Sequence, residues 1–232
     1  MKFITVAGPP SSGKTMALIH LIKLLKKDNV KVAIGKIDCH QTLDGKIFKE
    51  KLDIPVVVGI SDYVCPDHYG AVNAEEIFKF GESHDAEITI VETAGLCHRC
   101  APAIKDCLAI AVVDCVSGID TPRKIGPMLT TADVVVITKG DMVSQAEREV
   151  FRSNVLEVNP NAKAIELNGL TGMGALTLKR LVLEAKSTDT LNGMELRHDM
   201  PSAVCSYCEG ETRLGKDYQM GNVIKMDIEE VV

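Results

Sequence analysis

The sequence predicts an α/β protein with a mostly parallel central sheet that is flanked by helices. Apolar runs of strand length alternate with amphipathic stretches along most of the chain. These runs are continuous in valine and isoleucine, which is typical of parallel strands buried on both faces. The first run leads directly into a glycine-rich loop and a helical pattern, the order that phosphate-binding loops require.

Individual strands and helices can be placed from these patterns. The predicted strands cover residues 2–8, 31–38, 87–95, 109–116, 133–141 and 162–169. The predicted helices have apolar residues three to four positions apart, and they cover residues 15–27, 145–158 and 174–185. After about residue 187 the alternation stops. We therefore expect a nucleotide-binding domain over residues 1–187 and a small cysteine-containing appendage over residues 188–232.

Composition restricts the range of functions. The 232 residues are 46% hydrophobic and 25% charged, as in a folded globular protein, and the net charge of −6 argues against a nucleic-acid partner. No apolar run reaches the roughly 18 residues of a membrane span, so no membrane partner is expected. The N-terminal stretch has no signal-peptide pattern, which predicts a cytoplasmic protein. In that reducing compartment the eight cysteines are expected to be thiols, metal ligands or redox groups.

The strongest motif is GPPSSGKT, residues 8–15, which satisfies the P-loop pattern between a strand and a helix. Backbone N–H groups of such a loop surround phosphate oxygens, the lysine adds a positive charge, and the hydroxyl that follows it binds Mg²⁺. The fold is therefore predicted to be that of a P-loop nucleoside triphosphatase. The predicted nucleotide contacts here are Gly8, Pro9, Ser11, Ser12, Gly13, Lys14, Thr15 and Met16.

The motif ITKGD, residues 137–141, favours GTP over ATP. A carboxylate at Asp141 can accept hydrogen bonds from the N1–H and the exocyclic amine of guanine, whereas adenine has no matching donors. Thr138 and Lys139 complete this predicted base site, and a loop with Asn168 and Leu170 could close over the base. The alternative is that Lys139 and Asp141 merely begin a helix, with the aspartate as its N-cap.

The motifs together resemble a known family, the GTPases that deliver nickel to urease and hydrogenase, within the wider class of signal-recognition-particle GTPases. The resemblance covers roughly residues 1–186 and is strongest to the urease accessory GTPase. It depends on the P-loop, on residues 112–141 before and including the guanine motif, and on the TGMG turn at 171–174. In CPDHYG, Cys65 and His68 are similar to the metal-binding Cys-Pro-His element of the urease protein.

The resemblance implies roles for three further residues and a mode of action. Asp38 is similar to the aspartate that serves Mg²⁺ or orients the attacking water, Glu92 would hold a magnesium-bound water, and Gly95 stands at the switch glycine. The expected catalytic residues are thus Lys14, Asp38 and Glu92, and the expected magnesium residues are Thr15, Asp38 and Glu92. Hydrolysis is expected to be slow until a partner docks, and the protein is expected to dimerise around nucleotide or metal.

This chain departs from the family pattern at several points. Thr138 replaces the usual asparagine of the guanine motif, as in the signal-recognition GTPases, and Asp67 is inserted between Pro66 and His68. The segment LCHRC carries a second thiol, and the C-terminal appendage adds a CxxC pair of its own. The resemblance therefore implies a metal-binding protein that is switched by its nucleotide, and it does not identify urease as the enzyme that receives the metal.

The cysteines leave two kinds of metal site open. Cys97 with Cys100 and Cys205 with Cys208 could form a tetrahedral zinc site or hold an iron–sulfur cluster, although the pairs lie more than 100 residues apart. Cys65 with His68 is a third candidate pair. By contrast, Cys107 and Cys115 lie in or beside apolar runs and are expected to be buried thiols, whereas Cys39 has no assigned role. His20 is expected to be a partly buried helix residue, and His40 and His84 are expected to face solvent.

Two functional hypotheses follow from the sequence. The first is a GTP-hydrolysing metallochaperone that loads nickel or a zinc-like metal onto a client metalloenzyme, directly or through its maturation factors. The second is a nucleotide-dependent iron–sulfur or redox carrier, with a cluster held by CxxC pairs and possibly shared across a homodimer. We prefer the first hypothesis, because the Cys-Pro-x-His element and the urease-like middle segment indicate borderline metals.

Overall fold

The fold is built on one parallel sheet. The structure is a computed structural model, and it describes residues 1–94, 103–197 and 209–231. Its strands are β1 (Lys2–Ala7), β2 (Val32–Asp38), β3 (Val56–Ile60), β4 (Ile88–Glu92), β5 (Leu108–Asp114), β6 (Val134–Thr138) and β7 (Lys163–Leu167). They form a seven-stranded sheet in the order β3-β2-β4-β1-β5-β6-β7, and every pairing between them is parallel. The predicted α/β fold is therefore confirmed.

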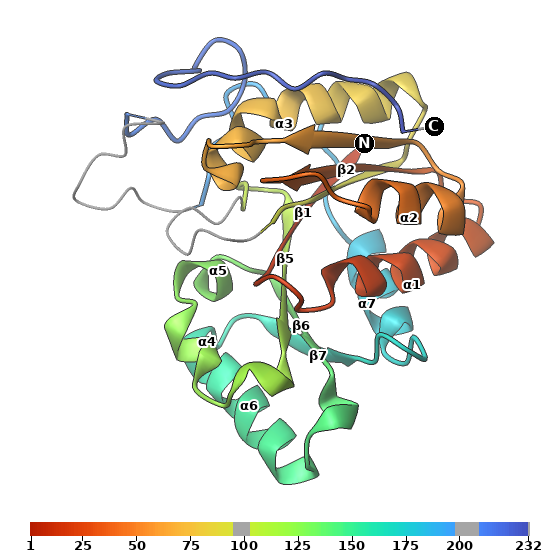
Figure 1. Cartoon of the computed structure of the whole chain (residues 1–232), viewed down its shortest axis with the longest axis vertical. Helices are drawn as coiled ribbons and strands as arrows, with labels where there is room; N and C mark the ends of the chain where they lie inside the picture. Colours follow the sequence, from red (N-terminus) through yellow and green to blue (C-terminus); the bar gives the residue numbers. More distant parts are fainter. Residues whose placement is uncertain (95–102, 198–208, 232) are drawn as a thin grey trace.

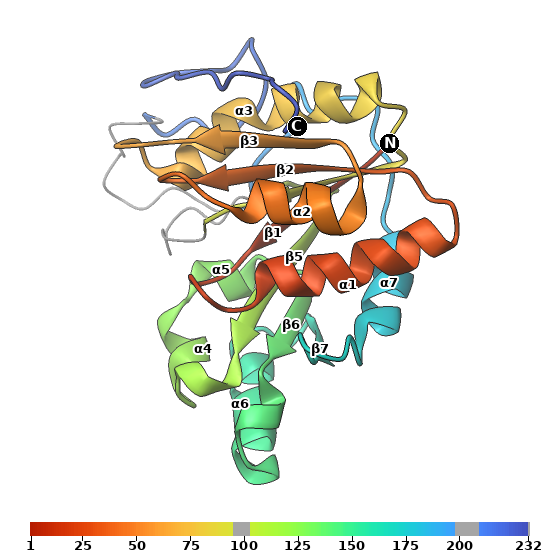
Figure 2. The ribbon, with the colours of Figure 1, turned by 45° about the vertical axis from the view of Figure 1, so that its right-hand side comes forward.

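Helices cover both faces of the sheet (Figures 1 and 2). One face packs against α1 (Lys14–Lys27), α2 (Asp44–Leu52) and α7 (Ala175–Leu183). The opposite face packs against α3 (Pro66–Ser83), α4 (Thr121–Lys124), α5 (Pro127–Thr130) and α6 (Gln145–Val158). Within the described residues no helix is both long enough and apolar enough to span a lipid bilayer.

The continuous apolar runs of the sequence become strands that are buried on both faces. In β1, Ile4 and Val6 pack beneath α1, whereas Phe3 belongs to the cluster beneath α3. In β5, Ile110 and Ala111 divide in the same way between the two faces. Alternation of side chains across a strand requires apolar residues at every position when both faces are covered.

Three elements near the sheet edge were not predicted. The strand β3 has only five residues and follows Pro55, and α2 and α3 lie between it and its neighbours. The expected helices at residues 15–27, 145–158 and 174–185 correspond to α1, α6 and α7, with ends that agree within two residues. The additional strand extends the predicted sheet without altering its class.

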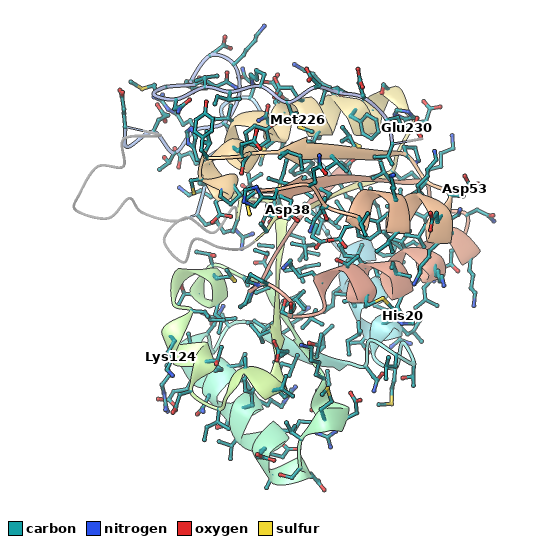
Figure 3. The ribbon with its side chains drawn as sticks, viewed as in Figure 1. His20, Asp38, Asp53, Lys124, Met226 and Glu230 are labelled. Carbon is teal, nitrogen blue, oxygen red and sulfur yellow. The ribbon has the colours of Figure 1, made fainter. Side chains whose placement is uncertain are left out.

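The C-terminal residues run along α3 and onto the sheet edge. We call residues 209–231 the C-terminal strap; Met226 and Glu230 mark its course in Figure 3. Met226 N donates to Asn73 Oδ1 at 2.9 Å, and Asn73 Nδ2 donates to Ile224 O at 3.0 Å. Val231 N donates to Val56 O of β3 at 2.9 Å. The strap thus shares the hydrophobic cluster of the α3 face, while the division of the chain at residue 187 remains a prediction.

Candidate nucleotide and metal site

The P-loop joins the end of β1 to the start of α1. Gly13 has φ of 91°, a left-handed conformation that glycine adopts without strain, and α1 begins at the next residue. A side chain at Gly8 would place its Cβ 2.2 Å from Val112 O, so only glycine lets the loop approach β5. The local geometry therefore exposes the N-terminus of α1, with its unpaired N–H groups, at the carboxyl edge of the sheet.

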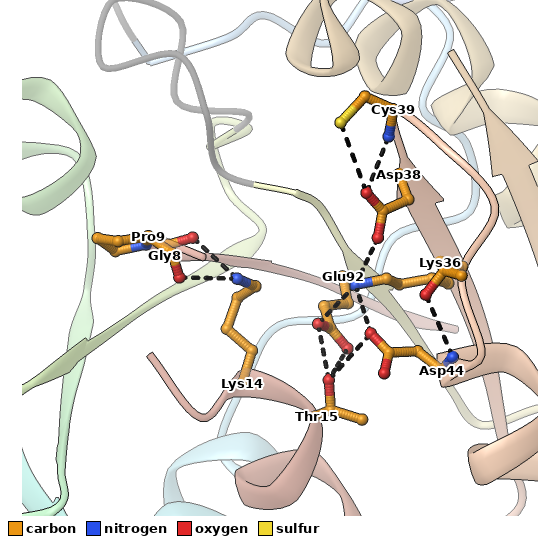
Figure 4. A network of polar contacts seen from close by, with 10 residues as sticks. Gly8, Pro9, Lys14, Thr15, Lys36, Asp38, Cys39, Asp44 and Glu92 are labelled. Atoms are coloured by element: carbon orange, nitrogen blue, oxygen red, sulfur yellow. Dashed lines mark hydrogen bonds and ion pairs between the residues drawn. The ribbon is translucent and has the colours of Figure 1, made fainter. Parts of the chain in front are cut away.

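Lys14 lies folded over this loop. Its Nζ donates to Gly8 O at 2.9 Å and to Pro9 O at 3.1 Å, and the side chain is buried (Figure 4). Burial lowers the pKa of Lys14, against the attraction of the Glu92 carboxylate. Phosphate oxygens would be stronger acceptors for this ammonium group than two neutral carbonyls, because hydrogen bonds between ionised partners are about twice as strong.

Beside the P-loop lie three acidic residues, two of which contact Thr15. We call Asp38, Asp44 and Glu92 the carboxylate cluster. Thr15 Oγ1 lies 3.2 Å from Glu92 Oε1 and 3.3 Å from Asp44 Oδ2. These residues come from α1, from the end of β4 and from the first turn of α2, which the parallel sheet brings to one edge.

Lys36 lies among the three carboxylates of the cluster (Figure 4). Its Nζ is 2.9 Å from Glu92 Oε1, 3.0 Å from Asp44 Oδ2 and 3.6 Å from Asp38 Oδ2. Although burial lowers the pKa of Lys36, attraction and hydrogen bonding from Glu92 and Asp44 raise it overall, so the amine is charged at neutral pH. Burial of Glu92, which is 1% exposed, raises the pKa of that carboxyl, and the charge of Lys36 opposes this effect.

A cavity of about 450 Å³ opens between the P-loop and this cluster. It is lined by Pro10, Ser11, Gly13, Lys14, Thr15, Met16, Lys36, Asp38, Cys39, Asp44, Glu92 and Ala94. Five of the P-loop contacts and all three catalytic residues expected from the sequence therefore line one cavity. The amine, hydroxyl and carboxylate groups around it could hold a polyphosphate together with a cation.

The donor atoms of the site suit magnesium. Mg²⁺ prefers oxygen ligands and is commonly held by one or two carboxylates together with substrate phosphates. Thr15 Oγ1 and the carboxylates of Asp44 and Glu92 converge within 3.3 Å of that hydroxyl, with Asp38 beside them. The residues present thus fit the ion. Asp44 was not among the predicted magnesium residues, because it lies six positions beyond Asp38 in a stretch without a recognisable pattern.

The predicted base motif is connected directly to the P-loop. Thr138 Oγ1 donates to Ser12 O at 2.6 Å and lies 3.2 Å from Val113 O. Its side chain also packs against Gly13, where an added Cβ would lie 3.5 Å from Thr138 Oγ1. The threonine that replaces asparagine in this motif therefore contacts the phosphate loop from β6, which is separated from β1 by β5 in the sheet.

Beyond Thr138, the chain turns sharply toward the predicted base contacts. Lys139 has φ of 55°, and its Nζ lies 3.8 Å from Asp114 Oδ1. Asp141 is exposed in the short turn Gly140–Met142 and does not cap α6, whose N-cap is Ser144. Asp141 as the N-cap of a helix is therefore wrong, although Lys139 and Asp141 do lie at the start of the 3-10 helix Gly140–Met142.

The loop after β7 is shaped by Asn168. Its Oδ1 accepts hydrogen bonds from Leu170 N at 2.8 Å and from Thr171 N at 3.0 Å, which folds the backbone into a tight turn. Leu170 is 83% exposed at the tip of that turn. Asn168 thus acts on the loop conformation in this structure, and contact of Leu170 with a base remains a prediction.

The predicted transition-metal residues are only partly described. Cys65 is the N-cap of α3, and His68 lies in its first turn, where Nε2 is 2.7 Å from Asn222 O of the strap. Burial lowers the pKa of His68, against this hydrogen bond. Gly95, Cys97, Cys100, Cys205 and Cys208 lie outside the described residues. Within residues 1–94, 103–197 and 209–231, no group of three or more potential metal ligands is found.

Three other cysteines are well placed in the structure. Cys107 and Cys115 are buried, as expected, and burial raises the pKa of each thiol to about 11. Cys39 follows Asp38, lines the nucleotide cavity, and its Sγ lies 3.7 Å from Asp38 Oδ1. Among the histidines, His20 is part-buried on α1, with Nε2 2.9 Å from Gly169 O.

The parallel sheet, the P-loop at the end of β1 and the carboxylates at the neighbouring strand ends define a P-loop nucleoside triphosphatase. The family model of the CobW/HypB/UreG nucleotide-binding domain matches residues 2–166, and the chain belongs to this family. Members of the family are GTPases, and this chain is accordingly a GTP hydrolase. The resemblance drawn from the motifs is thereby confirmed.

Individual relatives and solved structures agree with this assignment. An uncharacterized protein of Methanocaldococcus jannaschii is 50% identical over 227 residues, which cover 98% of this chain and 97% of the relative. The urease accessory protein UreG of Haloquadratum walsbyi is 28% identical over 185 residues, covering 74% of this chain and 89% of that protein. HypB of Helicobacter pylori, solved in complex with nickel, is similar in fold with a TM-score of 0.66 at 19% identity, covering 82% and 91% of the two chains.

Sequence reasoning missed the residue at the centre of the site. Lys36 stands inside an apolar strand pattern, residues 31–38, and was read only as part of that strand. A charged residue in the interior of a run that is buried on both faces is a usable signal, because an unpaired buried charge is costly. Its partners on β4 and α2 are far away in sequence, so the signal identifies a buried ion pair without naming its members.

Proposed function

We propose that this chain is a GTP-driven metallochaperone, which binds nickel or a zinc-like metal and transfers it to a client metalloenzyme or to that enzyme's maturation factors. Support comes from the family, which contains a urease accessory protein at 28% identity and a HypB protein solved with nickel. Cysteine and histidine in CPDH are ligands that suit borderline metals such as Ni²⁺ and Zn²⁺.

One observation carries the proposal. Glu92 is buried in the nucleotide cavity, and only four residues separate it from the CHRC segment that begins at Cys97. Loops that register the γ-phosphate in switch GTPases change their order between the triphosphate and diphosphate states. Thiols on the segment after Glu92 would therefore be rearranged by GTP binding and hydrolysis.

The Cys65 and His68 pair is the second metal element of the proposal. Because His68 Nε2 donates to Asn222 O, Nδ1 is the ring nitrogen that carries the lone pair in the neutral imidazole. Two ligands per chain complete half of a tetrahedral set. We infer that a second copy of the chain, or the thiols of residues 97–100, supplies the others.

The proposed hydrolysis depends on residues of the P-loop edge. Lys14 would leave the carbonyls of Gly8 and Pro9 to neutralise the outer phosphates, and Thr15 with the carboxylates would hold Mg²⁺. When bound, that ion neutralises charge on the β- and γ-phosphates. Asp38 would orient the attacking water at the cavity wall, Glu92 would hold a magnesium-bound water, and the exposed Asp141 would bind guanine.

Dimerisation around the nucleotide is supported by exposed apolar side chains. Leu43, Tyr63, Val116 and Ile119 are exposed in loops that follow the carboxyl ends of β2, β3 and β5, which lie at the same edge of the sheet as the cavity. Large apolar side chains that gather on one face indicate an interaction surface. A homodimer across this edge would bring two nucleotide sites together.

The deciding experiment is a metal titration in two nucleotide states. Ni²⁺ or Zn²⁺ is titrated calorimetrically into apo protein with GDP and then with a non-hydrolysable GTP analogue, without oxygen. We expect the metal affinity to change by about 5- to 150-fold between the two states, the usual size of an allosteric coupling. Because thiolate and neutral imidazole bind the metal, affinity is also expected to fall as the pH drops below about 7.

Cysteine variants make this test specific. Cys97→Ser with Cys100→Ser should remove the nucleotide effect, while Cys107→Ser, at a buried thiol outside the site, should leave it intact. Identical isotherms with GDP and with the GTP analogue in the unmodified protein would contradict the proposal and leave the CHRC segment as a static zinc clip.

The iron–sulfur alternative is tested in the same preparation. It requires Cys97, Cys100, Cys205 and Cys208 to share one cluster within a chain or across a homodimer. Protein purified without oxygen would then be brown and would contain iron and sulfide, whereas a nickel or zinc chaperone carries neither. Iron and sulfide at stoichiometric amounts, lost in Cys205→Ser with Cys208→Ser, would replace the chaperone proposal.

A further inference from the structure

We infer that Lys36 is a built-in counter-ion of the magnesium site, which keeps divalent cations out of the nucleotide-free protein and yields its place when a nucleoside triphosphate binds. The inference concerns the regulation of ion entry at the GTPase site. It holds whichever metal is the cargo, and it does not depend on the chaperone proposal.

The geometry places this ammonium group where a divalent ion would have to bind. Lys36 Nζ contacts all three members of the carboxylate cluster, at 2.9 Å, 3.0 Å and 3.6 Å. Two of those carboxylates, Glu92 and Asp44, are also the partners of Thr15 Oγ1, the hydroxyl that serves magnesium in P-loop proteins. The lysine and the ion therefore compete for the same oxygen atoms.

Burial keeps the charge of Lys36 within the site. The Lys36 side chain is only 3% exposed, in the middle of a parallel strand, so its charge cannot be carried away into solvent without cost. The other lysine of the cavity, Lys14, directs its amine to Gly8 O and Pro9 O instead. Attraction from Glu92 and Asp44 raises the pKa of Lys36, in agreement with a permanent positive charge.

Charge balance explains what the lysine does. Three carboxylates beside a hydroxyl would form an oxygen-rich cation site even in the absence of nucleotide, and they would repel an incoming triphosphate. One ammonium group at hydrogen-bond distance offsets part of that negative charge and opposes a divalent ion by like-charge repulsion. A triphosphate adds negative charge and oxygen ligands, and the balance then favours entry of the ion together with the nucleotide.

The consequence is control over when the carboxylates bind a metal ion. Without Lys36, the cluster would also take up transition-metal ions in the empty state, since carboxylate oxygens bind these as well as Mg²⁺. With Lys36 in place, the carboxylates are reserved for the ion that arrives with the nucleotide. Lys36 is thus a positioning residue of the carboxylates and a determinant of when, and with what, the ion binds.

The test measures Mn²⁺ binding by electron paramagnetic resonance in nucleotide-free protein. We compare the unmodified chain with Lys36→Gln, which keeps a hydrogen-bond donor without the charge, and with Lys36→Arg, which keeps the charge. Lys36→Gln should bind Mn²⁺ at least about tenfold more tightly, given the strength of a like charge at this distance. Lys36→Arg should remain close to the unmodified protein, and adding Asp44→Asn to Lys36→Gln should reverse the gain, which locates the ion at the cluster.

The unmodified protein provides an independent measurement should Lys36→Gln fail to fold. Its Mn²⁺ affinity should rise by at least about tenfold when a non-hydrolysable GTP analogue is added, beyond the affinity of Mn²⁺ for the free analogue. Mn²⁺ affinity in folded Lys36→Gln equal to that of the unmodified chain would overturn the inference. It would equally be overturned if nucleotide-free unmodified protein bound Mn²⁺ at the cluster as tightly as the analogue complex does.

Discussion

Asp141 illustrates how a single side chain can set base selectivity. It lies exposed in the turn after β6 and leaves the capping of α6 to Ser144, so its carboxylate remains available to a ligand. An aspartate accepts two hydrogen bonds, which matches the two donors on the guanine edge. Thr138, three residues earlier, fixes the start of this turn against the P-loop.

We predict that Asp141→Asn weakens GTP binding by about 1–3 kcal/mol, because one guanine donor loses its charged acceptor. Calorimetric titration of GTP, ATP and their diphosphates measures this change. Glu149→Gln, an exposed change on the nearby helix α6, serves as the control and should leave affinity unaltered. Equal affinities of the unmodified protein for GTP and ATP would rule out Asp141 as the selective residue.

The cysteines differ in chemical accessibility. At pH 8 only about one molecule in a thousand is ionised at a thiol whose pKa is about 11, as at Cys107 and Cys115, and thiolate is the reactive form. Cys39 is half-buried at the wall of the nucleotide cavity. We predict that iodoacetamide modifies Cys39 at least about tenfold faster than either buried thiol.

Peptide mass spectrometry after timed alkylation measures the three rates. Addition of a GTP analogue should slow the reaction at Cys39, because the nucleotide would occupy the cavity that this thiol lines. Rates at Cys107 and Cys115 should not respond to nucleotide. Rapid modification of either of these residues in folded protein would show that the sheet opens around them.

At the scale of elements, α3 depends on the strap that crosses it. Glu75 Oε2 accepts a hydrogen bond from Lys216 N of the strap at 3.0 Å, and Oε1 lies 2.7 Å from Lys79 Nζ. Burial raises the pKa of this carboxyl, but the hydrogen bonds from Lys79 and Lys216 outweigh it and lower the pKa from its ordinary value of 4.5. The ionised form is therefore the one that holds the strap.

We predict that Glu75→Gln lowers the free energy of unfolding by about 0.5–1.5 kcal/mol at pH 7. Because the folded-state pKa is depressed, the contribution of Glu75 is fully present above pH 4.5 and is lost as the pH falls through the lower folded value. Denaturant unfolding at pH 7 and below pH 4 should therefore show a difference between variant and unmodified protein that shrinks in acid.

The control for this prediction lies on the same helix. Glu82 is exposed near the end of α3, and Glu82→Gln should change stability by less than about 0.5 kcal/mol at either pH. If the effect of Glu75→Gln were the same in acid and at neutral pH, its origin would be packing and not the ionised hydrogen bonds.

At the scale of the whole molecule, the loops at the carboxyl edge of the sheet would form the interface of the proposed homodimer. Leu43 and Tyr63 are 71% and 82% exposed there. We predict that Leu43→Lys with Tyr63→Lys weakens nucleotide-dependent self-association by at least about tenfold, since buried apolar anchors dominate interfaces. Light scattering with a GTP analogue measures the association.

Leu183→Lys provides the matched control, since Leu183 ends α7 at the opposite edge of the sheet. As monomers, both variants should bind the GTP analogue with the same affinity as the unmodified protein. A dimer that persists unchanged in the double variant would place the interface on another face.

Much of this architecture could be predicted because its strands and its P-loop each follow from a short stretch of sequence. The six predicted strands are present, since a parallel strand under two layers of helices requires apolar residues at consecutive positions. The P-loop was recognisable because phosphate binding demands glycine at Gly8 and Gly13, as the close approach to Val112 and the positive φ show. The sequence thus located β1, the loop and α1 together.

The features that could not be predicted from the sequence depend on contacts between residues far apart in the chain. The helix α3 contains glycines at residues 70 and 81, which weaken a helical pattern, and it is stabilised by packing against β2, β4 and the strap. The strap has no regular repeat, because its hydrogen bonds go to Asn73, Glu75 and Val56 on other elements. The role of Lys36 depends likewise on carboxylates that arrive from β4 and α2.

The end of the strap also covers the edge strand β3, where strands of other molecules could otherwise pair. The outermost strand β3 would present unpaired backbone groups, and such an edge can template the addition of strands from other molecules, the first step toward aggregates. Val231 N donates to Val56 O, and Glu230 forms an antiparallel bridge with Val57, while Lys49 binds the Glu230 carboxylate at 2.6 Å. Because these partners are more than 170 residues apart in the sequence, the edge is covered only when the C-terminal residues have docked, and variants that loosen the strap should aggregate more readily during refolding.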